Sequence, residues 1–365
     1  MAKKIKGKHW KICGLLFFAA YFFAAARPIQ EETILVPRWV TAYEDGTLAT
    51  LGNFAAAQSG ETLVPFRIEQ SRYGYIRHDG NFALNRIAQG NFDLSQDFWA
   101  EHASNPPHIQ VMNPQSQSVL TIEKPRGFPL FLDGRIFLVG GGQNSLTAIG
   151  SDGQELWQHD FRAPLTSIAA AAGRIIAGTI DGSVELLNSQ GKLVIPPFEP
   201  GGSRLQAIYG VDISGDGHRI AVISGIDSQR FLLLEQTGDI FRVIHHEFLG
   251  SGFRRSVYVS FADNDRHVVF EREGGIGIYD ITARAGTTLP LPGEIRALDT
   301  NGESPYLFVV TSPTPDSKRF IAIRYPGAVV IDTPFDSNAA FFSRRGNRVF
   351  LGSDSVMAAF ELRKR

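Results

Sequence analysis

Short apolar runs separated by tight turns recur along most of this chain, and this repetition limits the possible folds more than any other feature. The clearest unit joins residues 129–132 to 135–139 through Asp133-Gly134, and residues 145–149 to 155–158 through a turn that ends at Gly153. Glycine accepts the positive φ that such hairpin turns need. The pattern therefore predicts four consecutive antiparallel strands, joined by short turns.

Similar units follow further along the chain. Residues 211–222, 259–270 and 341–350 each read as a strand, a polar turn and a second strand. The spacing is 38 positions from Gly153 to Gly191 and 48 from Gly217 to Asp265. Four short strands in roughly 40 residues are typical of one β-propeller blade. We therefore predict an all-β chain folded as a β-propeller.

The number of blades follows from the boundaries of these units. Five full units lie near residues 127–163, 166–200, 206–250, 255–293 and 295–335. A sixth unit contains Arg72–Gly80 and His108–Lys124, with an insertion at 88–105. The last strands (338–362) lack an outermost partner, which Ile34–Val36 or Trp39–Tyr43 can supply by closing the ring. This gives seven four-stranded blades, or eight if residues 47–125 divide into two units.

Two local motifs resemble known bacterial propellers. The Asp-Gly turn and the Leu-Thr-Ala-Ile-Gly-Ser-Asp-Gly-Gln-Glu-Leu-Trp run at 146–157 resemble the repeat of quinoprotein-like propellers, and the run at 212–221 is similar to the inner hairpin of WD40-type and TolB-like propellers. The resemblance implies the architecture but no particular activity. Quinone-dependent dehydrogenases of this fold carry an adjacent cysteine pair, which a chain with one cysteine cannot supply.

The N-terminus carries a different signal. Five lysines within the first 11 residues precede an uncharged, largely apolar stretch at 12–26 that ends in Ala24-Ala25-Ala26. This pattern predicts an apolar helix that acts as a signal peptide or a signal anchor over residues 1–26. Fifteen helical residues span about 22 Å, less than a bilayer core of roughly 30 Å, which favours cleavage. We expect a linker at 27–32 and an exported propeller domain at 33–365, facing the periplasm.

Composition excludes several classes of protein. The chain has 365 residues, a formal net charge of −1 and a single cysteine. A general nucleic-acid binder needs an excess of basic residues, and a disulfide scaffold or cysteine-rich zinc module needs more cysteines. An apolar content of 43% is enough for a large core. We therefore expect no nucleic-acid partner and no disulfide framework.

The sequence offers few candidates for chemistry. The run from Asp212 to Gly217 begins like a calcium loop, but Ile223 occupies the twelfth position, where a bidentate glutamate is needed. His245 and His246 are neighbours on a strand and point to opposite faces, so they do not chelate one ion. We expect no metal and no cofactor. Asp212, Asp263 and Asp299 lie at comparable places in successive units, which makes them candidate acids around one mouth of the central channel.

The function that we expect is that of a protein-interaction scaffold. Envelope propellers of the quinoprotein-like group include a component of the outer-membrane protein assembly machinery, so the resemblance implies a non-enzymatic scaffold that binds another envelope protein. Residues 12–26 contact the membrane if they are not cleaved. The candidate contact loop contains Phe98, Trp99, Asn105, Pro106 and Pro107. The alternatives are a hydrolase or lyase that uses the channel-mouth acids, and a small-ligand-binding propeller.

Overall fold

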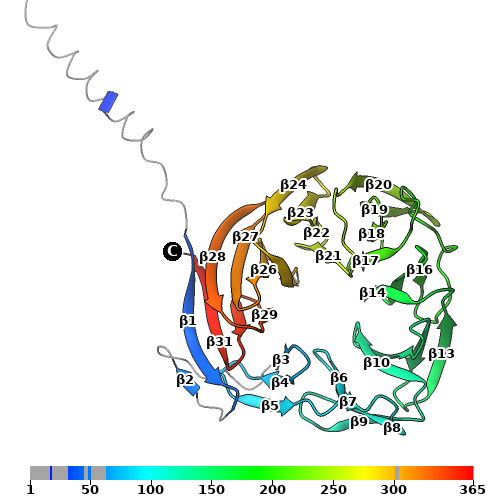
Figure 1. Ribbon diagram of the computed structural model, residues 1–365, viewed down its shortest axis with the longest axis horizontal. Helices are drawn as coiled ribbons and strands as arrows, with labels where there is room; N and C mark the ends of the chain where they lie inside the picture. Colours follow the sequence, from blue (N-terminus) through cyan, green and yellow to red (C-terminus); the bar gives the residue numbers. More distant parts are fainter. Residues whose placement is uncertain (1–16, 19–31, 45–47, 51–62, 301–303, 365) are drawn as a thin grey trace, which may run out of the picture.

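The fold of this protein is a closed ring of small β-sheets (Figure 1). The computed structural model describes residues 17–18, 32–44, 48–50, 63–300 and 304–364. Within these residues, 31 strands form eight antiparallel sheets, and each sheet is one blade. The innermost strands line the centre of the ring and the outermost strands form its rim (Figure 1).

The first four blades follow one another along the chain. Blade 1 contains β3 (Val64–Ile68), β4 (Arg72–Ile76) and β5 (Phe82–Ile87). Blade 2 contains β6 (Asn91–Leu94), β7 (Trp99–His102), β8 (His108–Met112) and β9 (Ser118–Glu123). Blade 3 contains β10 (Gly127–Leu132), β11 (Arg135–Gly140), β12 (Ser145–Ile149) and β13 (Glu155–Asp160). Blade 4 contains β14 (Leu165–Ala171), β15 (Arg174–Thr179) and β16 (Val184–Leu187).

The other four blades complete the ring. Blade 5 contains β17 (Ile208–Ile213), β18 (Arg219–Ser224), β19 (Arg230–Thr237) and β20 (Ile240–Phe248). Blade 6 contains β21 (Val259–Ala262), β22 (His267–Arg272), β23 (Gly275–Asp280) and β24 (Ala285–Pro290). Blade 7 contains β25 (Glu294–Asp299), β26 (Tyr306–Thr314), β27 (Ser317–Arg324) and β28 (Ala328–Asp336). Blade 8 contains β29 (Phe341–Arg345), β30 (Arg348–Gly352), β31 (Val356–Lys364), β1 (Thr33–Ala42) and β2 (Leu48–Thr50).

Blade 8 joins the two ends of the described chain, as the sequence predicted. β1 pairs with β31 along its whole length, from Thr33 opposite Lys364 to Ala42 opposite Val356. Trp39 on β1 is fully buried, and its Nε1–H donates to the carbonyl of His78 in blade 1 (2.9 Å). Closing the ring in this way shortens the exposed sheet edges. β2 then adds a fifth strand outside β1.

The prediction of seven blades is wrong, and the alternative of eight blades is correct. Residues 88–105 are not an insertion, because they form the inner hairpin β6–β7 of a separate blade. These two strands have four residues each and are rich in polar side chains, so their apolar pattern is too short to read. Strand number also differs from the prediction in blade 4, where residues 192–198 contribute only isolated bridges to β16.

The predicted N-terminal helix lies almost entirely outside the described residues. Of the apolar stretch at 12–26, only Phe17 and Phe18 are described, and both side chains are exposed. The described part of the chain contains no helix that is long and apolar enough to span a membrane.

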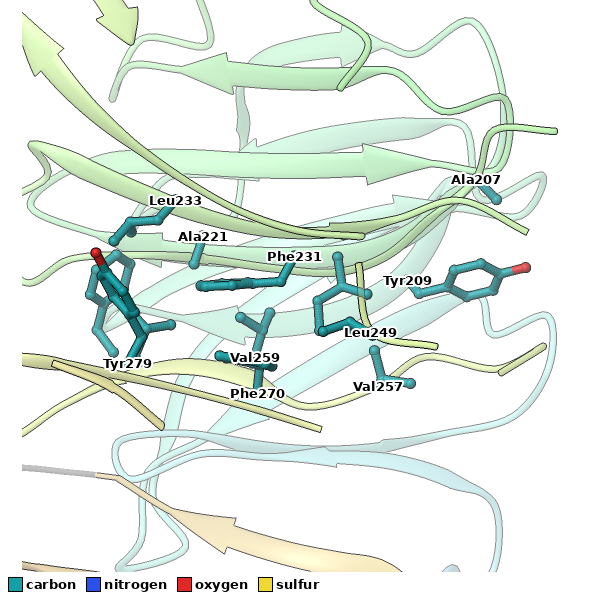
Figure 2. Packing of buried hydrophobic residues seen from close by; sticks show 13 residues of the cluster. Ala207, Tyr209, Ala221, Phe231, Leu233, Leu249, Val257, Val259, Phe270 and Tyr279 are labelled. Carbon is teal, nitrogen blue, oxygen red and sulfur yellow. The ribbon is translucent and has the colours of Figure 1, made fainter. Parts of the chain in front are cut away.

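The hydrophobic core lies between neighbouring blades. Figure 2 shows the cluster between blades 5 and 6, where Phe231 stacks on Phe270 with ring centroids 4.1 Å apart. Each side chain of this size stabilises the fold by about 2–3 kcal/mol when it is fully buried. The predicted hairpin turn between β10 and β11 is also present, with φ of 50° at Asp133 and 65° at Gly134. Turns and inter-blade packing therefore hold the sheets in a ring.

Candidate functional site

The three candidate channel-mouth acids come from neighbouring blades, but each has its own partners. Asp212 lies on the innermost strand β17, Asp263 directly follows β21, and Asp299 ends β25. Asp212 and Asp299 bond to groups on adjacent innermost strands, whereas Asp263 faces a buried histidine. Within the described residues, no group of three or more His, Cys, Asp or Glu side chains is placed to hold a metal ion. The acids therefore occupy three separate environments.

Asp212 links blade 5 to blade 6. Its Oδ2 accepts a hydrogen bond from the backbone N–H of Phe261 on β21, at 2.7 Å. Burial raises the pKa of Asp212 to about 6, although the hydrogen bonds that it accepts act in the opposite direction. A carboxylate in this position satisfies a buried backbone donor on the next blade. The main contact of Asp212 therefore joins two blades.

Asp299 links blade 7 to blade 8. Its Oδ2 lies 2.9 Å from Nε of Arg344 on β29, and both side chains are almost fully buried. Removing one member of such a pair leaves a buried charge without compensation. This pair therefore joins the two blades next to the ring closure.

The same kind of contact recurs around the channel. In blade 2, Asp93 Oδ2 accepts from the N–H of Phe131 in blade 3, at 2.9 Å. In blade 4, Ser167 Oγ accepts from the N–H of Val211 in blade 5, at 3.0 Å. We call these side chains inter-blade struts; the residues that form them are Asp93, Ser167, Asp212 and Asp299. This role explains the acids at Asp93, Asp212 and Asp299, in blades 2, 5 and 7.

Asp263 takes part in a different cluster. Its Oδ2 lies 3.3 Å from Nδ1 of His267, whose other ring nitrogen lies 3.5 Å from Asp280. The imidazole is 3% exposed and stacks on Tyr325 of blade 7 at 4.4 Å. Burial lowers the pKa of His267, and the two carboxylates partly offset this effect. The ring thus fills the space between blades 6 and 7.

The candidate contact loop divides into a buried part and an exposed part. Trp99 is 6% exposed, donates from Nε1 to the carbonyl of Asn113 (2.9 Å), and contacts Tyr73. Phe98 is half-buried and packs against the core between blades 2 and 3. Both aromatic residues are therefore part of the scaffold. The remaining candidates, Asn105, Pro106 and Pro107, lie in the surface connection between β7 and β8.

A hollow of about 450 Å³ lies beside this connection, between blades 1 and 2. Glu101 forms part of its wall and accepts hydrogen bonds from the hydroxyl of Tyr73 (2.8 Å) and the N–H of Gly90 (3.2 Å). Burial alone would raise the pKa of Glu101, but a hydrogen bond from the N–H of Gln89, the bonds from Tyr73 and Gly90, and the charge of Arg86 outweigh it and lower the pKa. The other lining side chains are mostly polar or aromatic: Arg86, Gln89, Trp99, His102, Gln110 and Met112.

The sequence did not indicate this hollow. It is lined by residues of β5 and the β5–β6 connection on one side and by residues of β7 and β8 on the other. In the sequence, the polar residues Glu101 and His102, shortly before Pro106-Pro107, are the one feature that could have pointed to this hollow. The carboxylate of Glu101 lies 3.4 Å from the guanidinium of Arg86, so these two charges compensate each other in the wall of the hollow.

Comparisons with known proteins agree with this architecture. A family model described as "beta-propeller protein" matches residues 1–365. An uncharacterised protein of Treponema pallidum (strain Nichols) is 27% identical over 352 residues, which cover 95% of this chain and 92% of that protein.

Two solved structures share the fold at low sequence identity. BamB from Moraxella catarrhalis has a TM-score of 0.60 and 13% identity, over 90% of this chain and all of that one. Apo AztD from Citrobacter koseri has a TM-score of 0.56 and 12% identity, over 80% of this chain and 88% of that one. The family model matches the whole chain, and eight sheets form a closed ring, so this protein belongs to the β-propeller family.

Proposed function

We propose that this chain is a non-catalytic scaffold that is exported to the bacterial cell envelope and binds another envelope protein through its rim. The observation that carries the proposal is the contrast between the centre and the rim of the ring. Asp212 and Asp299 act as inter-blade struts, while Asn105 and Pro107 are exposed in the connection that begins at Ala103, a residue of the hollow's wall. A rigid disc with recognition on surface connections is a common arrangement for binding proteins.

The hydrolase or lyase hypothesis was based on three acids that do not converge on one site. A general acid and base must converge on one reacting group. Asp212 bonds to a backbone N–H, Asp299 pairs with Arg344, and Asp263 faces His267 in an inter-blade contact. These three acids therefore favour scaffolding over catalysis.

Export is proposed from the N-terminal sequence. Five lysines followed by an apolar stretch at 12–26 have the order of a signal peptide or signal anchor. The fold that this chain shares with BamB and AztD is compatible with export, and the resemblance of residues 146–157 to envelope propellers supports it. If residues 12–26 are retained, they anchor the propeller to the inner membrane.

Site-specific crosslinking tests the binding proposal. A photo-reactive amino acid at Asn105 should crosslink one envelope protein in living cells, because this residue is exposed and lies two positions after Ala103 in the wall of the hollow. The same probe at Gln115 is the matched control, since that residue is exposed on the β8–β9 turn of the same blade. Equal crosslinking from both positions, or none from Asn105, would contradict the proposed contact surface.

A fusion tests export separately. Residues 1–32 should make alkaline phosphatase active, because that enzyme needs the oxidising compartment outside the cytoplasm to form its disulfides. A matched fusion in which Lys3, Lys4, Lys6, Lys8 and Lys11 are replaced by glutamate should be inactive or much less active. An inactive native fusion would contradict export.

A further inference from the structure

The outermost strand of blade 5 has an unusual number of exposed apolar side chains. On β20, Ile240 is 50% exposed, Val243 47%, Ile244 42% and Phe248 55%. β20 has nine residues without proline or glycine, and it lies at the rim of the ring (Figure 1). Its inner edge pairs with β19, and no described strand pairs with its outer edge. This edge presents backbone donors and acceptors together with apolar side chains.

Two other outermost strands contain residues that discourage further pairing. β28, also nine residues long, contains Pro334, and the six-residue β24 contains Gly286 and ends at Pro290. Proline cannot donate a hydrogen bond, and short or interrupted edges are the usual protection against unwanted strand addition. β20 carries Arg242, Glu247 and a bulge, which displaces Ile244 from the regular pairing pattern, but it contains no proline or glycine. The sequence of this edge therefore permits a strand to be added.

A second hollow, of about 510 Å³, lies between blades 5 and 6 where the bulge occurs. Ile244 forms one wall, and Tyr279 and Ile281 of blade 6 form another. Tyr279 is held in place by His245, whose ring stacks on it at 3.9 Å. The hollow thus offers an apolar wall of fixed shape against one face of β20.

The charge of this hollow indicates which side chain it prefers. Arg219 is paired with Glu235 at 2.8 Å. Arg284 also lines the hollow, is exposed, and makes no ion pair with any described residue. The three charged side chains therefore leave one positive charge in excess, which complements a carboxylate.

The chain itself shows that an outer edge of this propeller accepts one more strand. β2 pairs antiparallel with the outer edge of β1, with Trp39 opposite Thr50 and Thr41 opposite Leu48. Blade 8 consequently has five strands. A fifth strand on blade 5 would use the same geometry.

We propose that β20 binds an extended segment of a partner protein as a fifth strand of blade 5. The backbone of the segment pairs with the free edge, an apolar side chain enters the hollow at Ile244 and Tyr279, and an acidic side chain nearby pairs with Arg284. In such strand addition, main-chain hydrogen bonds supply affinity and side-chain pockets supply specificity. This inference rests on the proposed binding function and specifies the conformation and chemistry of one partner segment.

The test uses peptides and the folded propeller. A phage-displayed library of random peptides of about ten residues, long enough for one strand, is selected on the protein. Selected peptides should contain apolar residues together with Asp or Glu. Val243→Lys should weaken the best peptide at least tenfold, because a lysine on the edge opposes strand addition. Val329→Lys on β28 is the matched control, since both valines are 47% exposed on outermost strands.

Two further measurements complete the test. Arg284→Glu should weaken the acidic peptide at least fivefold, and peptide binding should slow amide exchange in residues 240–248. Equal losses from Val243→Lys and Val329→Lys, no selected peptide, or a dimer of this chain that buries β20 would each overturn the inference. The Asn105 crosslink is on another blade, so its persistence after such a result would leave the proposed function standing.

Discussion

Replacing Asp212 by asparagine should stabilise the protein at neutral pH. Burial raises the pKa of this carboxyl from 3.8 to about 6, so the folded state holds the proton more tightly than the unfolded chain. Two pKa units correspond to about 3 kcal/mol that the ionised group costs the fold near pH 7. Asparagine has no charge, and its Oδ1 can still accept the 2.7 Å bond from the N–H of Phe261.

The net effect is smaller than this cost. The amide nitrogen cannot accept a hydrogen bond as a carboxylate oxygen can, and this difference costs about 1 kcal/mol. We therefore expect Asp212→Asn to raise the free energy of unfolding by about 2 kcal/mol at pH 7.5. Below the unfolded-state pKa of 3.8, wild-type Asp212 is protonated in both states, and the advantage should disappear.

Urea denaturation at several pH values measures this effect. The wild-type protein should lose stability relative to the variant as the pH rises from 3.8 through about 6. Asp212→Leu is the matched control, because it removes both the charge and the acceptor for the Phe261 N–H. A destabilised asparagine variant at pH 7.5, or a stability difference that does not change with pH, would refute the reasoning.

Two other substitutions test the contacts that close the ring. Arg344→Ala should destabilise the protein by about 3 kcal/mol in thermal or denaturant unfolding, because it leaves Asp299 buried without its cation; a loss below about 1 kcal/mol would show that the pair is unimportant. Trp39→Ala should cost about 4 kcal/mol, since it removes a fully buried indole and its bond to the carbonyl of His78. An unchanged melting temperature for this variant would contradict the closure through β1.

Much of the architecture could be predicted from local sequence. Asp133-Gly134 marks a hairpin because both residues adopt the positive φ that the turn needs. The closure by β1 also follows from local pattern, because a missing outer strand at the C-terminus matches a spare apolar run at the N-terminus. Blade 2 escaped detection because β6 and β7 are only four residues long. Periodicity carries little information over so few positions.

The candidate site was less predictable, because its meaning depends on neighbours in space. The sequence places acids at comparable positions in successive units, but it cannot show that Asp212 faces the N–H of Phe261, 49 positions away. Nor can it show that Trp99 is buried while Asn105 is exposed, since both lie in one polar, Pro-containing stretch. The exposed apolar residues of β20 read as ordinary strand residues, and only the ring reveals that they lie on its rim.

Hydrogen exchange of the propeller, alone and with its crosslinked partner, tests the central claim most directly. A scaffold that binds through its rim should gain protection in the connection between β7 and β8, around Asn105, while the channel-lining strands β17 and β25 stay unchanged. Protection concentrated on β17 and β25, around Asp212 and Asp299, would place the functional surface in the channel and contradict the proposed function.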